Sequence, residues 1–210
     1  MNFLKRTLYK FGFEQTGSLS VEAVFAFPML AWAATATYTF FDAYKAQNAS
    51  YRANYTISDM LSRETVDINI DYLNGLLKVF RYMTYGHEDG SWIRVSVVKC
   101  NSNCADQNTR DLEFEWSKGA SGARDLEEID FLHYGDLIPL MPTGDQLILV
   151  ETSIDYKPPF ANSLVSFPER KLVSHVVTRP RFGPQLGWDS EYVSTDDGHD
   201  DGSSDPDPDT

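Results

Sequence analysis

The sequence predicts an α+β protein in which an N-terminal transmembrane helix extends out of the membrane and leads into a small antiparallel sheet of about four strands with one packed helix. Three patterns predict this fold. No charged residue occurs from Ala23 to Phe41, apolar residues recur every three or four positions from Ile70 to Met83, and four later segments have the patterning of strands. The chain divides accordingly into a basic leader (1–17), the transmembrane helix and its extension (18–62), an exported α+β domain (63–187) and a disordered acidic tail (188–210).

The uncharged apolar run is the strongest physical signal in the chain. Its length is near the minimum that crosses a hydrocarbon core about 30 Å thick. Asp42 follows the run, and the basic residues before it are Lys5, Arg6 and Lys10. Because positive charge close to a span is retained in the cytoplasm, we expect a cytoplasmic N-terminus and export of residues 42–210.

Pro28 lies within the apolar run and removes one backbone donor, so we expect a kink in the transmembrane helix there. An ordinary secretory signal peptide is an alternative interpretation of the same region. Such a peptide is cleaved at small residues after its apolar core, and Ala31, Ala33, Ala34 and Ala36 would supply them.

Glu22 stands five residues beyond Gly17, at the cytoplasmic end of the apolar run. A carboxylate at the edge of a membrane helix is costly unless it has a partner. A newly liberated α-amino group on a neighbouring subunit would be such a partner. The spacing from Gly17 to Glu22 therefore suggests that the glutamate carboxylate pairs with a neighbouring subunit during assembly.

A helical pattern continues beyond the membrane span, in residues Tyr44, Tyr51, Tyr55 and Met60. We expect the helix to extend outward, to break near residues 62–69 and to be followed by a second amphipathic helix that ends near Gly86. The apolar face of the second helix either packs on the protein's own sheet, which we favour, or contacts a partner.

The period of the apolar residues changes to two beyond Gly90, which is typical of strands. Strands are expected around Ile93–Val97 and Leu112–Trp116, joined by a polar turn. Two more strands are expected at Gln146–Tyr156 and Leu172–Arg179, each closed by proline.

The two cysteines, Cys100 and Cys104, are too few for a disulfide framework, and no histidine pair stands near them at zinc-ligand spacing. We interpret them as one local disulfide, which requires an oxidising compartment. Closing so short a ring stabilises a fold by about 2 kcal/mol.

Arg179 and Arg181 flank a proline at the end of the last expected strand. Their guanidinium groups can bind a carboxylate either on this chain or on a partner, and we favour structural pairing within the chain. The tail beyond them has almost no apolar residues and is expected to be disordered. Its carboxylates leave calcium binding as an alternative, although they lack the spacing of an EF-hand loop.

Composition and motifs argue against several classes of function. A net charge of −13 argues against nonspecific nucleic-acid binding. The four histidines form no zinc-protease motif, and neither a nucleophile elbow nor a phosphate loop is present, so we expect no enzymatic activity, cofactor, metal or small-molecule substrate. A pair of carboxylates that meet only in the folded structure is the remaining enzymatic alternative.

The segment from Gly17 to Glu22, Gly-Ser-Leu-Ser-Val-Glu, followed by an apolar helix, resembles the processing site of type IV prepilin-like proteins. With Pro28-Met-Leu and the small and aromatic residues through Tyr44, it is most similar to the TadE-like family of the tight-adherence (Tad/Flp, type IVc) pilus systems. The matching segment, residues 17–47, covers about one seventh of the chain.

This resemblance implies cleavage between Gly17 and Ser18 by a prepilin peptidase, after which Glu22 is the fifth residue of the mature chain and sets its register in a helical assembly. It also implies a bacterial inner-membrane protein with its domain in the periplasm or in a surface pilus. The implied partners are the prepilin peptidase, sibling pseudopilins, the platform proteins and ATPase of the Tad machinery, and the lipid bilayer.

Two departures from the pilin pattern favour a minor pseudopilin over the main fibre subunit. Ser18 stands where many type IV pilins carry an aromatic residue, and Ala23 stands where major pilins of this class commonly have tyrosine. The expected function is therefore a part in assembling adhesive Flp pili. The alternative is a single-pass, membrane-anchored periplasmic binding module that is neither processed nor assembled into a filament.

Overall fold

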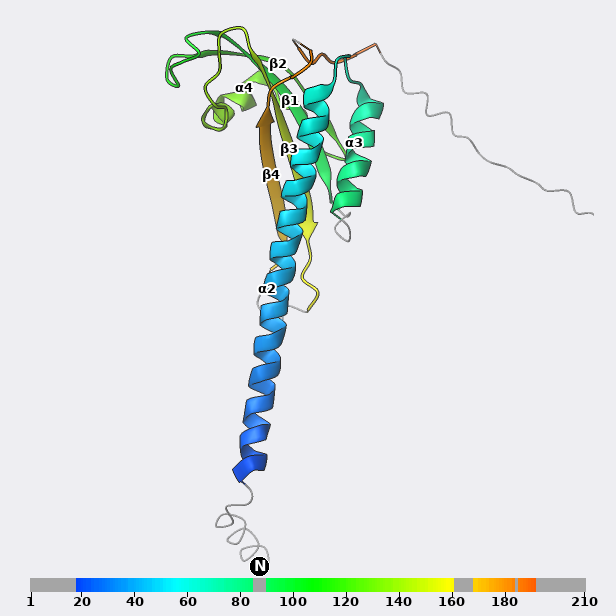
Figure 1. The fold of residues 1–210 in the computed structure, drawn as a ribbon, viewed down its shortest axis with the longest axis vertical. Helices are drawn as coiled ribbons and strands as arrows, with labels where there is room; N and C mark the ends of the chain where they lie inside the picture. Colours follow the sequence, from blue (N-terminus) through cyan, green and yellow to red (C-terminus); the bar gives the residue numbers. More distant parts are fainter. Residues whose placement is uncertain (1–17, 85–89, 161–167, 184, 192–210) are drawn as a thin grey trace, which may run out of the picture.

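The computed structural model describes residues 18–84, 90–160, 168–183 and 185–191, and it confirms the predicted α+β fold class. One long helix projects from a four-stranded antiparallel sheet, and a second helix packs on the same face of that sheet (Figure 1). The leader, including Gly17, and tail residues 192–210 lie outside the described residues.

Helix α2 spans Ser18–Arg63 and joins the predicted membrane segment to the domain without interruption. It ends one residue beyond the expected boundary at 62. Pro28 lies inside this continuous helix. The helix continues through this residue, since a proline removes only one backbone donor, and the expected kink at Pro28 stays a prediction.

Helix α3 spans Ile70–Met83, and its ends have clear chemical causes. At the start, the side chain of Asn69 accepts a hydrogen bond of 2.9 Å from the backbone N–H of Tyr72, as an N-cap does. At the end, the backbone N–H and the hydroxyl of Thr84 both donate to the carbonyl of Phe80. The helix thus ends before the expected position near Gly86, which is outside the described residues.

The sheet consists of β1 (Trp92–Ser102), β2 (Asp111–Ala120), β3 (Gln146–Tyr156) and β4 (Arg170–Thr178) in the order β2-β1-β3-β4. All neighbours are antiparallel. The third strand has the predicted bounds, and the first continues past Val97 through a register shift to the cysteine region. Two short elements, α4 (Glu128–Phe131) and η2 (Leu132–Leu137), lie in the connection from β2 to β3.

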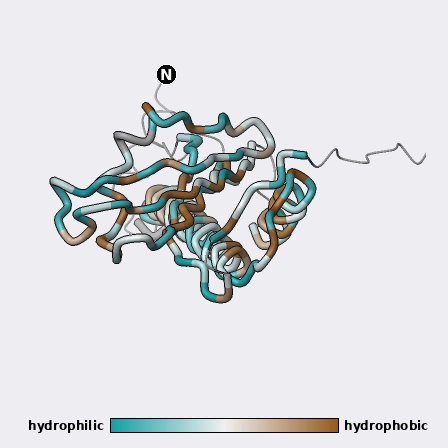
Figure 2. The backbone as a smooth tube through the Cα atoms, turned by 90° about the horizontal axis from the view of Figure 1, so that it is seen from above, coloured by the Kyte–Doolittle hydropathy of each residue, from teal (hydrophilic) through white to brown (hydrophobic). Residues whose placement is uncertain are grey.

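The main core lies between the two long helices and one face of the sheet. Helix α2 packs on β3 and β4, and α3 packs on β1 and β2. Viewed along α2, hydrophobic segments gather where the helices face the sheet (Figure 2). The apolar face of α3 is therefore buried on the protein's own sheet, as favoured, through Leu73, Leu76, Leu77 and Phe80. A smaller core on the opposite face includes Val98, Ile138 and Met141.

The chain beyond β4 returns to the domain. Trp188 forms a parallel bridge with Ile68, and its ring lies 5.6 Å from that of Trp116. The backbone N–H of Asp189 donates to the carbonyl of Ile68. Composition places Trp188 at the start of the tail, but its partly buried indole packs against Trp116 and the main core, which makes it part of the domain.

Candidate functional site

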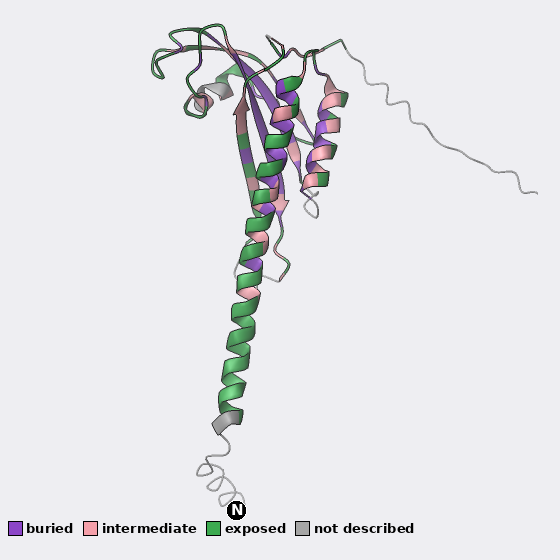
Figure 3. Ribbon diagram, viewed as in Figure 1, coloured by how far each residue is buried: buried purple, intermediate pink, exposed green. Residues whose placement is uncertain are grey.

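The N-terminal half of α2 is apolar, and none of the described residues outside the helix covers it (Figure 3). Every residue from 20 to 34 is exposed, and only 6% of the most apolar window is buried. The core helix of a soluble protein would be covered at these positions. The exposed large apolar side chains here are Val21, Val24, Phe25, Phe27, Met29, Leu30 and Trp32. The segment is long and apolar enough to cross a membrane.

The predicted processing and assembly residues lie at the lower end of this segment. Ser18 is the first residue of α2, and Glu22 follows one turn later with an exposed side chain. Of the two residues of the expected cleavage site, Gly17 lies outside the described residues and Ser18 belongs to α2.

The upper half of α2 has one buried and one exposed face. The buried face is built from small and aliphatic residues such as Ala53, Ile57 and Leu61, each fully buried. The tyrosines of the sequence pattern lie elsewhere: Tyr44 and Tyr55 are 60% and 64% exposed. The tyrosine face is therefore not the face that packs on the sheet.

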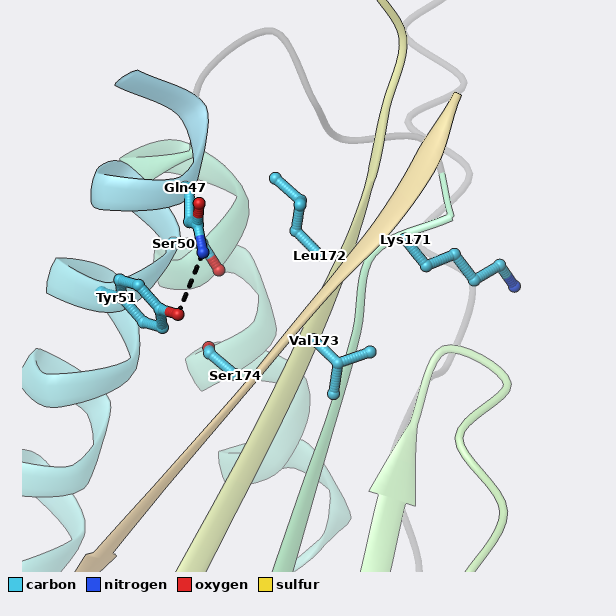
Figure 4. Close-up of a pocket in the computed structure, with 7 residues that line it drawn as sticks. All are labelled: Gln47, Ser50, Tyr51, Lys171, Leu172, Val173 and Ser174. Carbon is cyan, nitrogen blue, oxygen red and sulfur yellow. Dashed lines mark hydrogen bonds between the residues drawn. The ribbon is translucent and has the colours of Figure 1, made fainter. Parts of the chain in front are cut away.

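A groove runs between α2 and the edge strand β4. It consists of two adjoining hollows of about 220 and 230 Å³ that share Gln47 and Leu172. In Figure 4, Gln47 and Tyr51 of the helix face Leu172 across the upper hollow, and the amide of Gln47 donates to the Tyr51 hydroxyl over 3.1 Å. Ser50 also lines this hollow, and its buried hydroxyl has no hydrogen-bond partner among the described residues.

Two polar contacts hold α2 on the sheet. The buried Tyr156 hydroxyl, at the end of β3, donates to the Asp42 carboxylate over 3.0 Å. Burial, together with the nearby carboxylate, raises the pKa of Tyr156, so the phenol remains a donor. Higher on the helix, the Asn54 amide donates to the Ser174 hydroxyl of β4 over 3.0 Å. Sequence reasoning missed both contacts, since no local pattern links residues so far apart.

A buried ion pair lies on the opposite face of the sheet. A guanidinium nitrogen of Arg94 is 2.7 Å from the Glu151 carboxylate, and the two side chains are only 12% and 7% exposed. Arg94 also donates to the Tyr134 hydroxyl and lies over the Trp92 ring. Both charges are therefore matched within the fold, as a structural pair requires.

The structure separates the two predicted arginines. Arg179 lies 3.0 Å from the carboxylate of Asp145, just before β3, whereas Arg181 lies 3.4 Å from that of Asp59 on α2. The Arg181 backbone N–H also donates to the Ser62 carbonyl, at the end of the helix. Both arginines thus pair within the chain, the interpretation we favoured.

Cys100 and Cys104 form a disulfide at the end of β1, with their Cα atoms 6.0 Å apart. The Cys100 carbonyl accepts from the backbone N–H of Gly144, in the turn that precedes β3. The disulfide therefore stabilises the end of the sheet at which β3 begins. It does not lie near the exposed apolar half of α2.

Among the described residues, no three His, Cys, Asp or Glu side chains gather closely enough to hold a metal ion. Comparison of the chain with protein-family models, curated proteins and solved structures finds no match. Fold and site together define a class: an α+β domain carried on one helix that is long and apolar enough to span a membrane.

Proposed function

We propose that this protein is a TadE-like minor pseudopilin that takes part in assembling tight-adherence (Flp) pili and hence in surface adhesion. Its work is assembly rather than catalysis. It is held in the bacterial inner membrane by α2, with the N-terminus in the cytoplasm and the domain in the periplasm, and it is a substrate of the prepilin peptidase.

The observation that carries the proposal is the single helix that begins at Ser18 and continues to Arg63. Its lower half presents apolar side chains to lipid or to neighbouring helices, and its upper half is built into the domain. Because there is no break between the halves, the position of Glu22 in a helical assembly determines the position of the domain.

The uncovered face of α2 supports an assembly role. Glu22 and Phe40 are separated by about five turns of 3.6 residues and therefore lie on the same side of the helix. Tyr44, Tyr51 and Tyr55 continue that side upward at spacings of four, seven and four residues. All five side chains are exposed, so carboxylate, aromatic face and groove form one surface available to sibling pseudopilins.

The first test is the mature N-terminus. The full chain is expressed in a host with a prepilin peptidase and, separately, in the same host without it. Mass spectrometry of the membrane-bound protein should then give an N-terminus at Ser18 only when the peptidase is present. An intact Met1, or cleavage after the apolar run, would rule out processing as a prepilin.

The second test concerns Glu22. The substitution Glu22→Ala should abolish piliation or association with sibling pseudopilins, while insertion into the membrane stays unchanged. Glu14→Ala is the matched control, because it removes a carboxylate from the leader that cleavage discards. Normal pili in the Glu22→Ala strain would contradict the assembly role.

The groove between α2 and β4 favours one other function, a membrane-anchored binding module that is never processed. Such a protein would keep its leader, and Glu22→Ala would leave it fully active. The two tests above therefore separate the two functions.

A further inference from the structure

The domain makes contact with α2 inside the apolar run rather than beyond it. The Phe160 ring, just after β3, lies 5.6 Å from the Tyr38 ring in an edge-to-face arrangement, and Thr39 is fully buried by the domain. The uncharged run continues to Phe41. In Figure 1 the connection after β3 descends along the helix below the sheet. The lower end of the domain and the upper end of the span therefore occupy the same height.

The length of the helix shows that this overlap matters. From Ala23 to Tyr38 the helix rises by about 22 Å at 1.5 Å per residue, whereas the hydrocarbon core is about 30 Å thick. With Glu22 at one boundary, Tyr38 is about 24 Å above it, so Tyr38 and Phe160 lie about 6 Å short of the other boundary, and any tilt of the helix increases that shortfall.

Moving α2 along the membrane normal could take Tyr38 and Phe160 out of the hydrocarbon core, but it would bury Glu22. Placing Tyr38 at the outer boundary would put the inner boundary about 30 Å below it, near Ser18, and Glu22 would then lie about 6 Å inside the hydrocarbon. In the unassembled protein that carboxylate is expensive to bury. An aromatic ring at the interface is favourable, so the position with Phe160 in the membrane is preferred.

Basic residues lie just above the two rings. Lys45 is about 33 Å from Ala23 along the helix axis, which places it in the headgroup region. Lys157 directly follows the lower end of β3, Arg170 and Lys171 begin β4, and all four cations are exposed. Figure 4 shows Lys171 directed away from α2.

The carboxylates of the same region are less exposed than the cations. Asp42 is half-buried and accepts the hydrogen bond from Tyr156, and Asp155 is also half-buried. Glu169 is the exposed carboxylate among these three. Among the described residues, the exposed charge at the lower end of the domain is therefore mainly positive, which suits the phosphates of anionic phospholipids.

From this geometry we infer that the lower end of the domain is a second membrane-contact site, in which Phe160 inserts beside Tyr38 and the surrounding cations bind anionic headgroups of the outward leaflet. The inference rests on membrane anchoring by α2 but not on cleavage or filament assembly. In this inference the domain is attached to the membrane by α2 and also binds lipid through its own lower end.

The test uses the full chain in vesicles of phosphatidylcholine alone or with added phosphatidylglycerol. A nitroxide label is attached, after the native disulfide has formed, to one of three cysteine variants. Phe160→Cys reports on the proposed site, Leu30→Cys on the bare helix, and Val66→Cys on an exposed position beyond the far end of α2. Accessibility to oxygen and to a polar nickel complex gives the depth of each label.

We expect the label at residue 160 to shift toward the values of residue 30, and residue 66 to remain water-exposed. Phosphatidylglycerol should deepen the label at 160. That lipid-dependent shift should be lost when Lys45→Gln and Lys171→Gln are combined, and kept in the control Lys78→Gln on α3, which is also exposed.

Equal accessibility at residues 160 and 66 would overturn the contact site. A shift at 160 that does not depend on phosphatidylglycerol would overturn the role of the cations. A water-exposed label at residue 30 would instead overturn anchoring by α2, so failure of the inference and failure of the proposed function remain distinguishable.

Discussion

Removing Arg94 should destabilise the domain strongly, because its partner would be left as an unpaired buried charge. The Glu151 carboxylate is 7% exposed and lies 2.7 Å from the guanidinium. In the variant Arg94→Met the carboxylate stays in place without a cation. Breaking a buried pair in this way costs about 3–5 kcal/mol of the free energy of unfolding. Loss of the donation to Tyr134 contributes to this cost.

The matched control is an ion pair of the same kind at the surface. Arg63 and Asp59 are 2.9 Å apart on α2, with side chains 58% and 42% exposed. Solvent screens this pair, so Arg63→Met should cost at most about 0.5 kcal/mol. The double variant Arg94→Met/Glu151→Leu replaces both buried charges with apolar groups and should recover most of the loss.

Urea unfolding of the full chain in detergent micelles, followed by tryptophan fluorescence, measures all four proteins under one condition. The reasoning would be refuted if Arg94→Met fell within about 1 kcal/mol of the wild type. It would equally be refuted if the double variant were no more stable than the single variant. Either result would mean that the pair is solvated despite its burial.

Three further predictions concern other parts of the fold. Tyr156→Phe removes the donor to the Asp42 carboxylate and should lower stability by about 1–2 kcal/mol, with faster hydrogen exchange in α2 around Asp42. Replacing Cys100 and Cys104 by serine should cost about 2 kcal/mol, and reductant should lower the Tm of the wild type but not of the variant. Hydrogen bonds from a backbone amide and a hydroxyl lower the pKa of Asp106. The ionised carboxylate therefore stabilises the fold above the ordinary pKa of aspartate, and this stabilisation is lost as pH falls through the lowered pKa. An NMR titration of Asp106 with a midpoint at or above the ordinary pKa would contradict this.

Elements with a strong local pattern could be predicted from the sequence. Residues Gln146–Tyr156 form a strand with the expected bounds, because the run of apolar residues marks its extent and Pro158-Pro159 close its C-terminal end. The second helix begins after the expected break, since Asn69 can cap it without help from the rest of the fold. In both cases the deciding interactions lie within a few residues.

The packing of α2 could not be predicted in the same way. Large aromatic side chains dominate its sequence pattern, yet small residues such as Ala46 and Ala53 face the sheet because they let the helix approach closely. The return of Trp188 to the core depends on Trp116, far away in the chain. The charge of Arg94 gives no local sign that Glu151 is its partner. These features depend on tertiary contacts that pattern and propensity do not encode.

Because α2 is continuous from Ser18 to Arg63, a tilt of its lower half moves the domain attached to its upper half, as a lever arm does. From Asp42 to Arg63 the helix rises by about 32 Å at 1.5 Å per residue. A tilt of about 20°, ordinary for a single helix in a bilayer, therefore swings the far end of the arm sideways by about 11 Å. Because the sheet is fastened along this arm, the whole domain moves with it. If α2 spans a bilayer, a change in bilayer thickness, or a neighbouring helix that alters the tilt, would thus change the orientation of the domain without any change in its internal structure.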